Sequence, residues 1–170
     1  MKKIVVLALL AAAMTGYAST IPQDTWELQL GGQLRFDNAQ GKSDWLLESG
    51  LGYFLFDNIE FGYLADFGYD GDEPGLGLGG FAEANLDLDL FVVPYAALRL
   101  QYNFGGYYRS VAEHNYILSE YAGGLKFFLS PVVAVYTELY FDVASEEAFL
   151  RNEEAKNTDA GLKVGLRAYF

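Results

Sequence analysis

Hydrophobic and polar residues alternate along most of the chain after residue 25. In the segment 160–170, Ala, Leu, Val and Phe occupy the even positions, while Gly, Lys, Arg and Tyr occupy the odd ones. A period of two residues is typical of a β-strand with one apolar and one polar face. The pattern predicts eight strands, at about 26–36, 44–56, 59–70, 77–87, 93–104, 116–129, 132–142 and 160–170.

The segments between these strands are short and long in turn. Residues 57–58, 87–92 and 130–131 are predicted turns, whereas 37–43, 71–76, 105–115 and 143–157 are longer polar loops. This order predicts an up-and-down antiparallel arrangement with the tight turns at one end and the loops at the other. Frequent Gly, Tyr and Phe disfavour helices. The predicted fold class is therefore all-β, an eight-stranded antiparallel barrel.

Charged residues avoid the apolar face of the predicted strands. All cations within the predicted strands occupy positions of the polar face, namely Arg35, Arg99, Lys126, Lys163 and Arg167. An Arg or Lys that faced lipid at mid-bilayer would cost roughly 2–4 kcal/mol. The strands of a soluble β-sandwich would also separate apolar and charged positions in this way, so other features must distinguish a soluble fold from a membrane barrel. Long strands, glycines on the polar face and aromatic residues near strand ends favour a transmembrane barrel. The aromatic residues are Trp26, Trp45, Tyr53, Phe61, Tyr69, Tyr102, Phe104, Tyr121, Phe127 and Phe170.

Composition excludes several function classes. The net charge of −12 and pI near 4.3 argue against binding nucleic acid, which requires clustered cations. The absence of Cys excludes disulfides, thiol catalysis and Cys-based zinc sites. We predict no cofactor and no metal.

The first 18 residues are typical of a secretory signal peptide. Lys2 and Lys3 precede an apolar run, and Ala18 ends a small-residue cleavage motif. The apolar run is about half the ~20 residues that a spanning helix needs. We therefore predict a cleaved signal at 1–18 and a barrel domain at 19–170.

Several segments resemble the small outer-membrane β-barrel family that includes the OmpA transmembrane domain, OmpX and the opacity-type proteins. They are the eight strands, the segment 52–62, the start of the fifth strand at Val93-Pro94-Tyr95, and the terminal Arg167-Ala168-Tyr169-Phe170. The resemblance implies an outer-membrane location, periplasmic termini, contact with lipid and lipopolysaccharide, and a C-terminal signal, Tyr169 and Phe170, read by the barrel-insertion machinery.

The polar face predicts a lumen filled by side chains, because eight strands enclose little more than these. Charges buried there should pair. We expect cross-strand salt bridges between Glu27 and Arg167, Glu83 and Arg99, and Glu138 and Lys163. The predicted lumen charge network contains Glu27, Arg35, Glu48, Glu60, Glu83, Arg99, Glu120, Lys126, Glu138, Lys163 and Arg167.

Three functions remain open. The first is a structural or surface-interaction barrel, with loops 105–115 and 143–157 as candidate contact sites for a surface partner. The second is a narrow porin for ions or small solutes, and the third is a barrel enzyme that modifies lipid A. We expect no catalysis, because His114 is the only His and Ser119 lies five residues away, so no Ser, base and orienting group come together. The acidic run Asp70-Gly71-Asp72-Glu73 lacks the spacing of an EF-hand and is expected to be a solvated turn.

Overall fold

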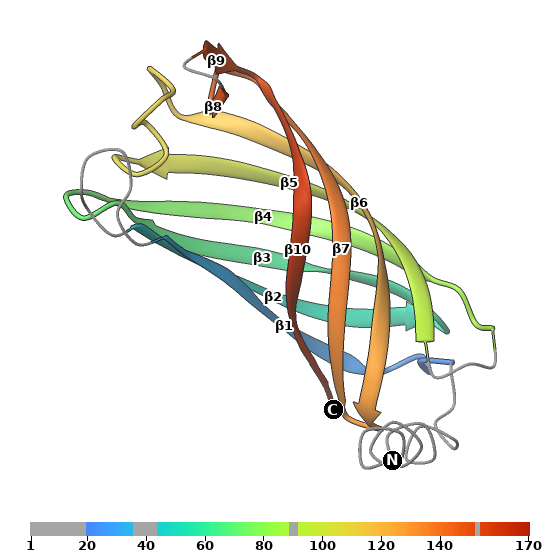
Figure 1. The fold of residues 1–170 in the computed structure, drawn as a ribbon. Helices are drawn as coiled ribbons and strands as arrows, with labels where there is room; N and C mark the ends of the chain where they lie inside the picture. The colour runs from blue at the N-terminus through green and yellow to red at the C-terminus, as the bar shows by residue number, and fades with distance from the viewer. Residues whose placement is uncertain (1–19, 36–43, 89–91, 152–153) are drawn as a thin grey trace, which may run out of the picture.

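The computed structural model describes residues 20–35, 44–88, 92–151 and 154–170, without the side chains of Arg35 and Arg151. The predicted signal peptide and the whole of the first predicted long loop, 37–43, lie outside this part. Eight antiparallel strands close into a barrel (Figure 1). No helix within the described ranges is long and apolar enough to cross a membrane. The barrel strands are β1 (Trp26–Arg35), β2 (Asp44–Phe56), β3 (Ile59–Tyr69), β4 (Pro74–Asn85), β5 (Val92–Gly105), β6 (Tyr116–Ser130), β7 (Val133–Ala144) and β10 (Thr158–Tyr169).

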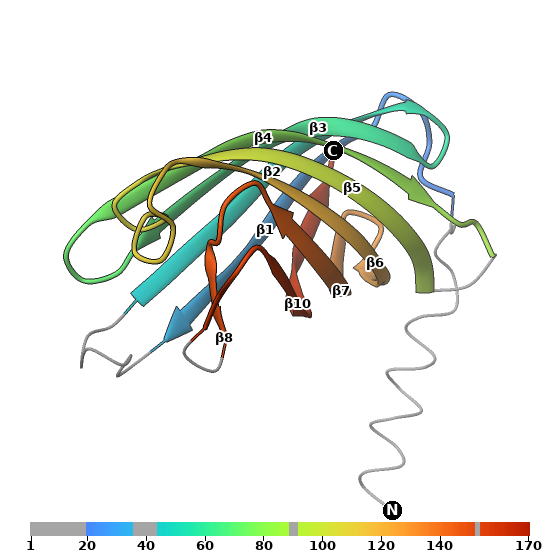
Figure 2. The same ribbon diagram turned by 90° about the horizontal axis from the view of Figure 1, so that it is seen from above.

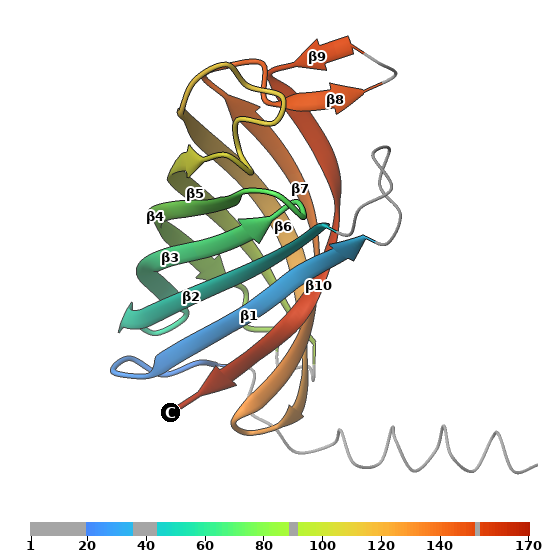
Figure 3. The same ribbon diagram turned by 90° about the vertical axis from the view of Figure 1, so that its left-hand side faces the viewer.

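Two predicted loops differ from the structure. β4 begins at Pro74, inside the predicted loop 71–76, where Pro74 lies opposite Tyr69. A proline without an N–H is tolerated as the first residue of a strand. The loop after β7 contains a small hairpin of its own, made by β8 (Phe149–Arg151) and β9 (Glu154–Lys156). Figure 3 shows this hairpin projecting beyond the barrel strands at the long-loop end.

The strands are strongly tilted. Starting at Glu27 and stepping from each residue to its partner on the next strand, the circuit through β2 to β7 arrives at Asp159 of β10. The direct partner of Glu27 on β10 is instead Tyr169, ten residues further on. With about 3.3 Å per residue and about 4.8 Å between strands, this offset corresponds to a tilt of about 40°. Figure 2 shows the tilted strands curving around the lumen.

The distribution of side chains is inverted relative to a soluble protein. Glu27 and Lys126 are fully buried, whereas Leu162 on the outer face is 65% exposed. Large apolar side chains cover the outer surface of every barrel strand. Monomeric soluble proteins rarely expose apolar patches of more than a few hundred Å². The alternation thus places its charged face inside and its apolar face outside.

Aromatic side chains gather at both ends of the outer surface. At the short-turn end, Trp26 packs on Tyr53 with ring centroids 4.9 Å apart, and at the other end Trp45 lies 5.2 Å from Phe67. Trp45 is opposite Leu34, eight residues beyond Trp26 along β1. At the tilt given above, the two groups are about 20 Å apart along the barrel axis. This spacing is close to the height of the apolar band of outer-membrane barrels, about 25 Å.

Candidate functional site

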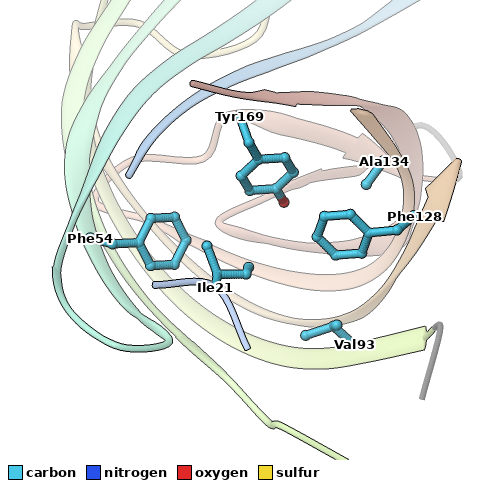
Figure 4. Close-up of a cluster of buried hydrophobic side chains, with 6 residues drawn as sticks. All are labelled: Ile21, Phe54, Val93, Phe128, Ala134 and Tyr169. Carbon is cyan, nitrogen blue, oxygen red and sulfur yellow. The ribbon is translucent and has the colours of Figure 1, made fainter. Parts of the chain in front are cut away.

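The short-turn end of the lumen is closed by an apolar cluster, which we call the plug (Figure 4). The chain before β1 contributes to it. The backbone N–H of Ile21 donates to the Asn58 side chain at 2.8 Å, and the carbonyl of Ile21 accepts from the Asn58 N–H at 2.9 Å. These bonds hold residues 20–25 across the barrel end. The plug consists of Ile21, Phe54, Val93, Phe128, Ala134 and Tyr169.

Directly above the plug lies a first layer of charges, fully sealed from solvent. Lys126 Nζ is 2.9 Å from Glu27 and 2.5 Å from Glu83. Arg167 bridges the same two carboxylates, at 2.9 Å from Glu83. The guanidinium of Arg167 also lies 4.7 Å from the ring centre of Tyr95. The two cations therefore neutralise the two carboxylates at a place that water does not reach.

Glu60 lies beside these residues but forms none of the bonds of the first charge layer. It is fully buried, and neither of its carboxyl oxygens has a hydrogen-bond partner. Its oxygens approach those of Glu27 and Glu83 within 4.8 Å, which makes this trio the only group of carboxylates among the described residues close enough to share one metal ion. Lys126 and Arg167 already occupy two members of the trio. The trio is thus better described as part of an ion-pair layer than as a metal site.

A second layer of charges lies further from the plug. Arg99 makes a two-pronged contact with Glu138, both bonds at 2.7 Å, and also bonds Glu120. Lys163 Nζ lies 2.8 Å from Glu48 and 2.6 Å from Glu120. The hydroxyl of Tyr95 donates to Glu138 at 2.8 Å, so that this tyrosine touches both layers.

The structure brings together nine of the eleven residues predicted to form the lumen network. Glu60 has no ionic bond, and the side chain of Arg35 lies outside the described part. The nine linked residues are Glu27, Glu48, Glu83, Arg99, Glu120, Lys126, Glu138, Lys163 and Arg167.

Of the three predicted salt bridges, the structure contains that between Glu27 and Arg167. Glu83 pairs with Lys126 and Arg167 and not with Arg99. In the observed register Glu83 lies opposite Ala97, while Arg99 lies opposite Phe81, so Glu83 and Arg99 are not directly opposed. Glu138 lies directly opposite Lys163, as predicted, yet it bonds Arg99 instead. The planar fork of an Arg matches both oxygens of a carboxylate, which a Lys ammonium does not.

Sequence reasoning placed Tyr169 on the polar face but missed Tyr95 and Tyr136, which also point inward. Both share the parity of the charged residues, which was the available signal, and all three tyrosines are buried. Phe54 and Phe128 break the rule that the inner face is polar, because they lie next to short turns and pack into the plug. The lumen is thus apolar at one end and charged in the middle.

At the long-loop end the lumen widens into a cavity of about 630 Å³, which we call the vestibule. A much smaller space of about 40 Å³, lined by Arg99 and Glu138 among others, reaches down between the charges. Seven carboxylates and a single cation, Lys163, line the described part of the vestibule. The carboxylates are Asp44, Glu48, Asp66, Asp70, Glu120, Asp142 and Asp159.

The loop 105–115 folds over the mouth of the vestibule. Tyr107 and Tyr108 meet edge to face with ring centroids 5.0 Å apart, and Tyr108 packs in the same way on Tyr116. Ala112 of this loop is 2% exposed and joins an apolar cluster with Ala144 and Phe149 of the other long loop. Burial raises the pKa of Tyr108 above its ordinary value. A substantial part of this loop thus serves as a lid.

Two further sequence candidates have simple structural positions. His114 is an exposed loop residue. In the acidic run, the Asp70 carboxylate accepts the backbone N–H groups of Asp72 at 2.9 Å and Glu73 at 2.8 Å. Gly71 takes a φ of +96° there. Asp70 therefore closes a local turn, as its sequence suggested.

Comparison with known proteins gives a fold match. No protein-family model matches the sequence, and no curated protein matches it. Among solved structures, the N-terminal β-barrel domain of Pseudomonas aeruginosa OprF matches with a TM-score of 0.61 and 15% identity, over 88% of this chain and 100% of that one. Neisserial surface protein A (NspA) matches with a TM-score of 0.55 and 15% identity, over 86% and 95% of the two chains.

The chain shares the eight-stranded barrel fold of these proteins. The predicted fold class and the predicted likeness to small outer-membrane barrels are thereby confirmed at the level of the fold. At 15% identity the likeness extends no further.

Proposed function

We propose that this chain is an integral outer-membrane barrel with a structural or surface-contact role, one that neither conducts solutes nor catalyses a reaction. The inverted distribution of side chains supports insertion into lipid, because a charged interior and an apolar exterior suit no aqueous solvent. The two groups of outer aromatic residues, about 20 Å apart, fit membrane interfaces.

The observation that carries the non-conducting role is the closed short-turn end. The plug includes Phe54 and Val93, both with no exposed surface, and the first charge layer behind it is equally sealed. A conducting path would have to displace Ile21 and break the bonds of Lys126 and Arg167. A narrow porin is the second candidate, because the vestibule and the small space below it extend the open lumen as far as the second layer of charges.

The test is planar-bilayer conductance of the refolded barrel domain, residues 19–170. We expect membranes that hold the folded protein to stay electrically silent. A matched variant, Phe54→Ala with Phe128→Ala, removes two plug rings and leaves the charge layers, so it is expected to stay silent too. Stable stepwise conductance of the unaltered protein would refute the non-conducting role and favour the porin.

We further propose that residues 1–18 are a cleaved signal, that the short turns and both termini face the periplasm and that the long loops face outward. The absence of Cys makes this easy to test. Ser110→Cys lies in the long loop 105–115, and Val132→Cys lies in the turn between β6 and β7. In intact cells, a membrane-impermeant maleimide is expected to label Ser110→Cys alone. Labelling of Val132→Cys alone would reverse the orientation.

The insertion signal is a proposal of the same kind. Phe170 is 69% exposed on the outer face, whereas Tyr169 is buried in the plug. Tyr169 thus has a packing role in the folded barrel, and we propose that Tyr169 and Phe170 together form the signal that the insertion machinery reads before the barrel closes. We also propose contact with lipopolysaccharide and, through the loops 105–115 and 143–157, with a surface partner. An unchanged lipid A profile on expression is expected, since His114 stands alone on an exposed loop.

A further inference from the structure

The vestibule contains carboxylates placed directly opposite one another on neighbouring strands. Asp142 of β7 lies between Glu120 of β6 and Asp159 of β10. On the other wall, Glu48 of β2 lies opposite Asp66 of β3. Like charges in directly opposed positions destabilise a sheet. Repeated on two walls, this cost is relieved by a proton shared between opposed carboxylates or by a bound cation.

The protein supplies only part of the compensating positive charge. Glu48 and Glu120 bond Lys163, but Asp66, Asp142 and Asp159 make no ion pair with any described residue. Asp142 is 6% exposed, and its Oδ1 has no hydrogen-bond partner.

An uncharged side chain of β5 that lines the vestibule is also unsatisfied. Asn103 is fully buried, lines the vestibule and has no hydrogen-bond partner for either polar atom of its amide. Buried polar groups are nearly always hydrogen-bonded in native proteins, so each exception calls for an explanation. A bound donor in the vestibule would satisfy both the Asn103 oxygen and the unpaired carboxylates.

Lys163 shows which group the vestibule accommodates. Its ammonium sits between Glu48 and Glu120 and lies 4.8 Å from the ring centre of Tyr140. Two carboxylates and an aromatic face are a favourable environment for an ammonium ion. The same kinds of group continue upward, where the Tyr140 hydroxyl donates to Asp159 at 3.4 Å and Tyr108 and Tyr116 line the cavity.

The spacing of the carboxylates decides the shape of the ligand. Within the described residues, no three vestibule carboxylates bring their oxygens within 4.8 Å of one another, as a single small metal ion requires. Neighbouring strands instead place opposed side chains about 5 Å apart. Several positive charges on a flexible apolar stem fit this row better than one compact ion, and the tyrosines provide contact for the stem.

We propose that the vestibule binds a linear aliphatic polyamine, with its ammonium groups on Asp142, Asp159 and Asp66 and its methylene stem against the tyrosines. The site is separate from the sealed end, and it therefore stands whether or not the barrel conducts. Residues of the loop 105–115 cover it, so binding is also expected to order this lid.

Isothermal titration of the folded protein, in a zwitterionic detergent and low-salt buffer, tests the proposal with spermidine as the probe. We expect saturable binding with one spermidine per barrel. The double variant Asp142→Asn and Asp159→Asn is expected to weaken it at least tenfold. This variant removes a like-charge contact, so it should fold, and heat-modifiable gel migration verifies that it has.

The matched control is Glu113→Gln with Glu147→Gln. It changes the net charge by the same amount at two exposed loop positions that do not line the vestibule. Unchanged binding in this control, together with the loss in the double variant, would support the proposal. No saturable binding, an equal loss in both variants, or displacement of spermidine by equimolar Mg²⁺ would overturn it.

Discussion

The two ends of the lumen are built from the same strands but treat charge in opposite ways. In the first charge layer, Lys126 and Arg167 each bridge Glu27 and Glu83, and the plug excludes water from all four. In the vestibule, Asp142 and Asp159 lie directly opposite each other, and neither makes an ion pair with a described residue. At the closed end the charges of the acids and cations balance, whereas the vestibule is open and carries an excess of carboxylates.

This difference shows that alternation along a strand determines which way a side chain points but not what it does there. Buried charges are tolerated at the closed end because each ion has a partner of opposite sign. Charges in the vestibule have water and space instead, since the cavity of about 630 Å³ admits solvent or a ligand. Three substitutions test this contrast, from the largest expected effect to the smallest.

The closed end should be the more sensitive to loss of a cation. Lys126→Met leaves Glu27 with Arg167 alone and removes a contact to Glu83 in a fully buried site. We expect the free energy of unfolding to fall by about 3–5 kcal/mol, which is the usual cost of breaking a buried ion pair. Urea unfolding in phosphocholine vesicles measures it.

The control for this prediction is Lys156→Met. Lys156 pairs with Glu154 at 3.4 Å on the β8–β9 hairpin, where their side chains are 42% and 76% exposed. An exposed pair contributes about 0–1 kcal/mol. Equal losses in Lys126→Met and Lys156→Met would mean that the first charge layer is hydrated.

A second prediction concerns crowding next to the closed end. A Cβ at Gly62 would lie 2.4 Å from both the Leu51 carbonyl oxygen and the Phe81 ring. Gly62→Ala is therefore expected to destabilise the barrel by about 1–3 kcal/mol. Gly123 is the matched outward-facing position, where the nearest atom is the Tyr95 carbonyl oxygen at 3.9 Å. Gly123→Ala should leave unfolding unchanged or slightly raise stability, and a reversed order of the two would contradict the inward orientation of Gly62.

The smallest effect is also the one with the opposite sign. Asp142→Asn removes a negative charge that lies between Glu120 and Asp159, so we expect stability to rise by about 0.5 kcal/mol. Glu120→Gln, in the same row, loses bonds to Arg99 and Lys163 and should cost about 2 kcal/mol. The same unfolding assay compares them, and a loss of stability in Asp142→Asn would indicate that Asp142 already shares a proton with Glu120 or has a cationic partner.

The identity of the lumen residues could be predicted from the sequence, but their partners could not. Parity assigns Glu83, Arg99 and Glu138 to the inner face, and all three are buried there. Which of them meet depends on the ten-residue offset around the barrel and on side chains long enough to cross it. Neither quantity is visible in a period-two pattern. The plug was missed for a related reason, since Phe54 interrupts the polar face and only its position beside a turn explains it.

The sequence by itself determined that this protein has eight long strands with one charged face and one apolar face, because a strand must alternate and each face must suit its solvent. Only the tertiary structure decided that Glu138 bonds Arg99 and not Lys163, its partner across the strands. It also decided that Ile21 helps to close one end of the lumen, and that Asp142 and Asp159 lie opposite each other without an ion pair at the other end. The physical reason is that ion pairing and closure depend on distances across the lumen, which the register and tilt of all eight strands set together.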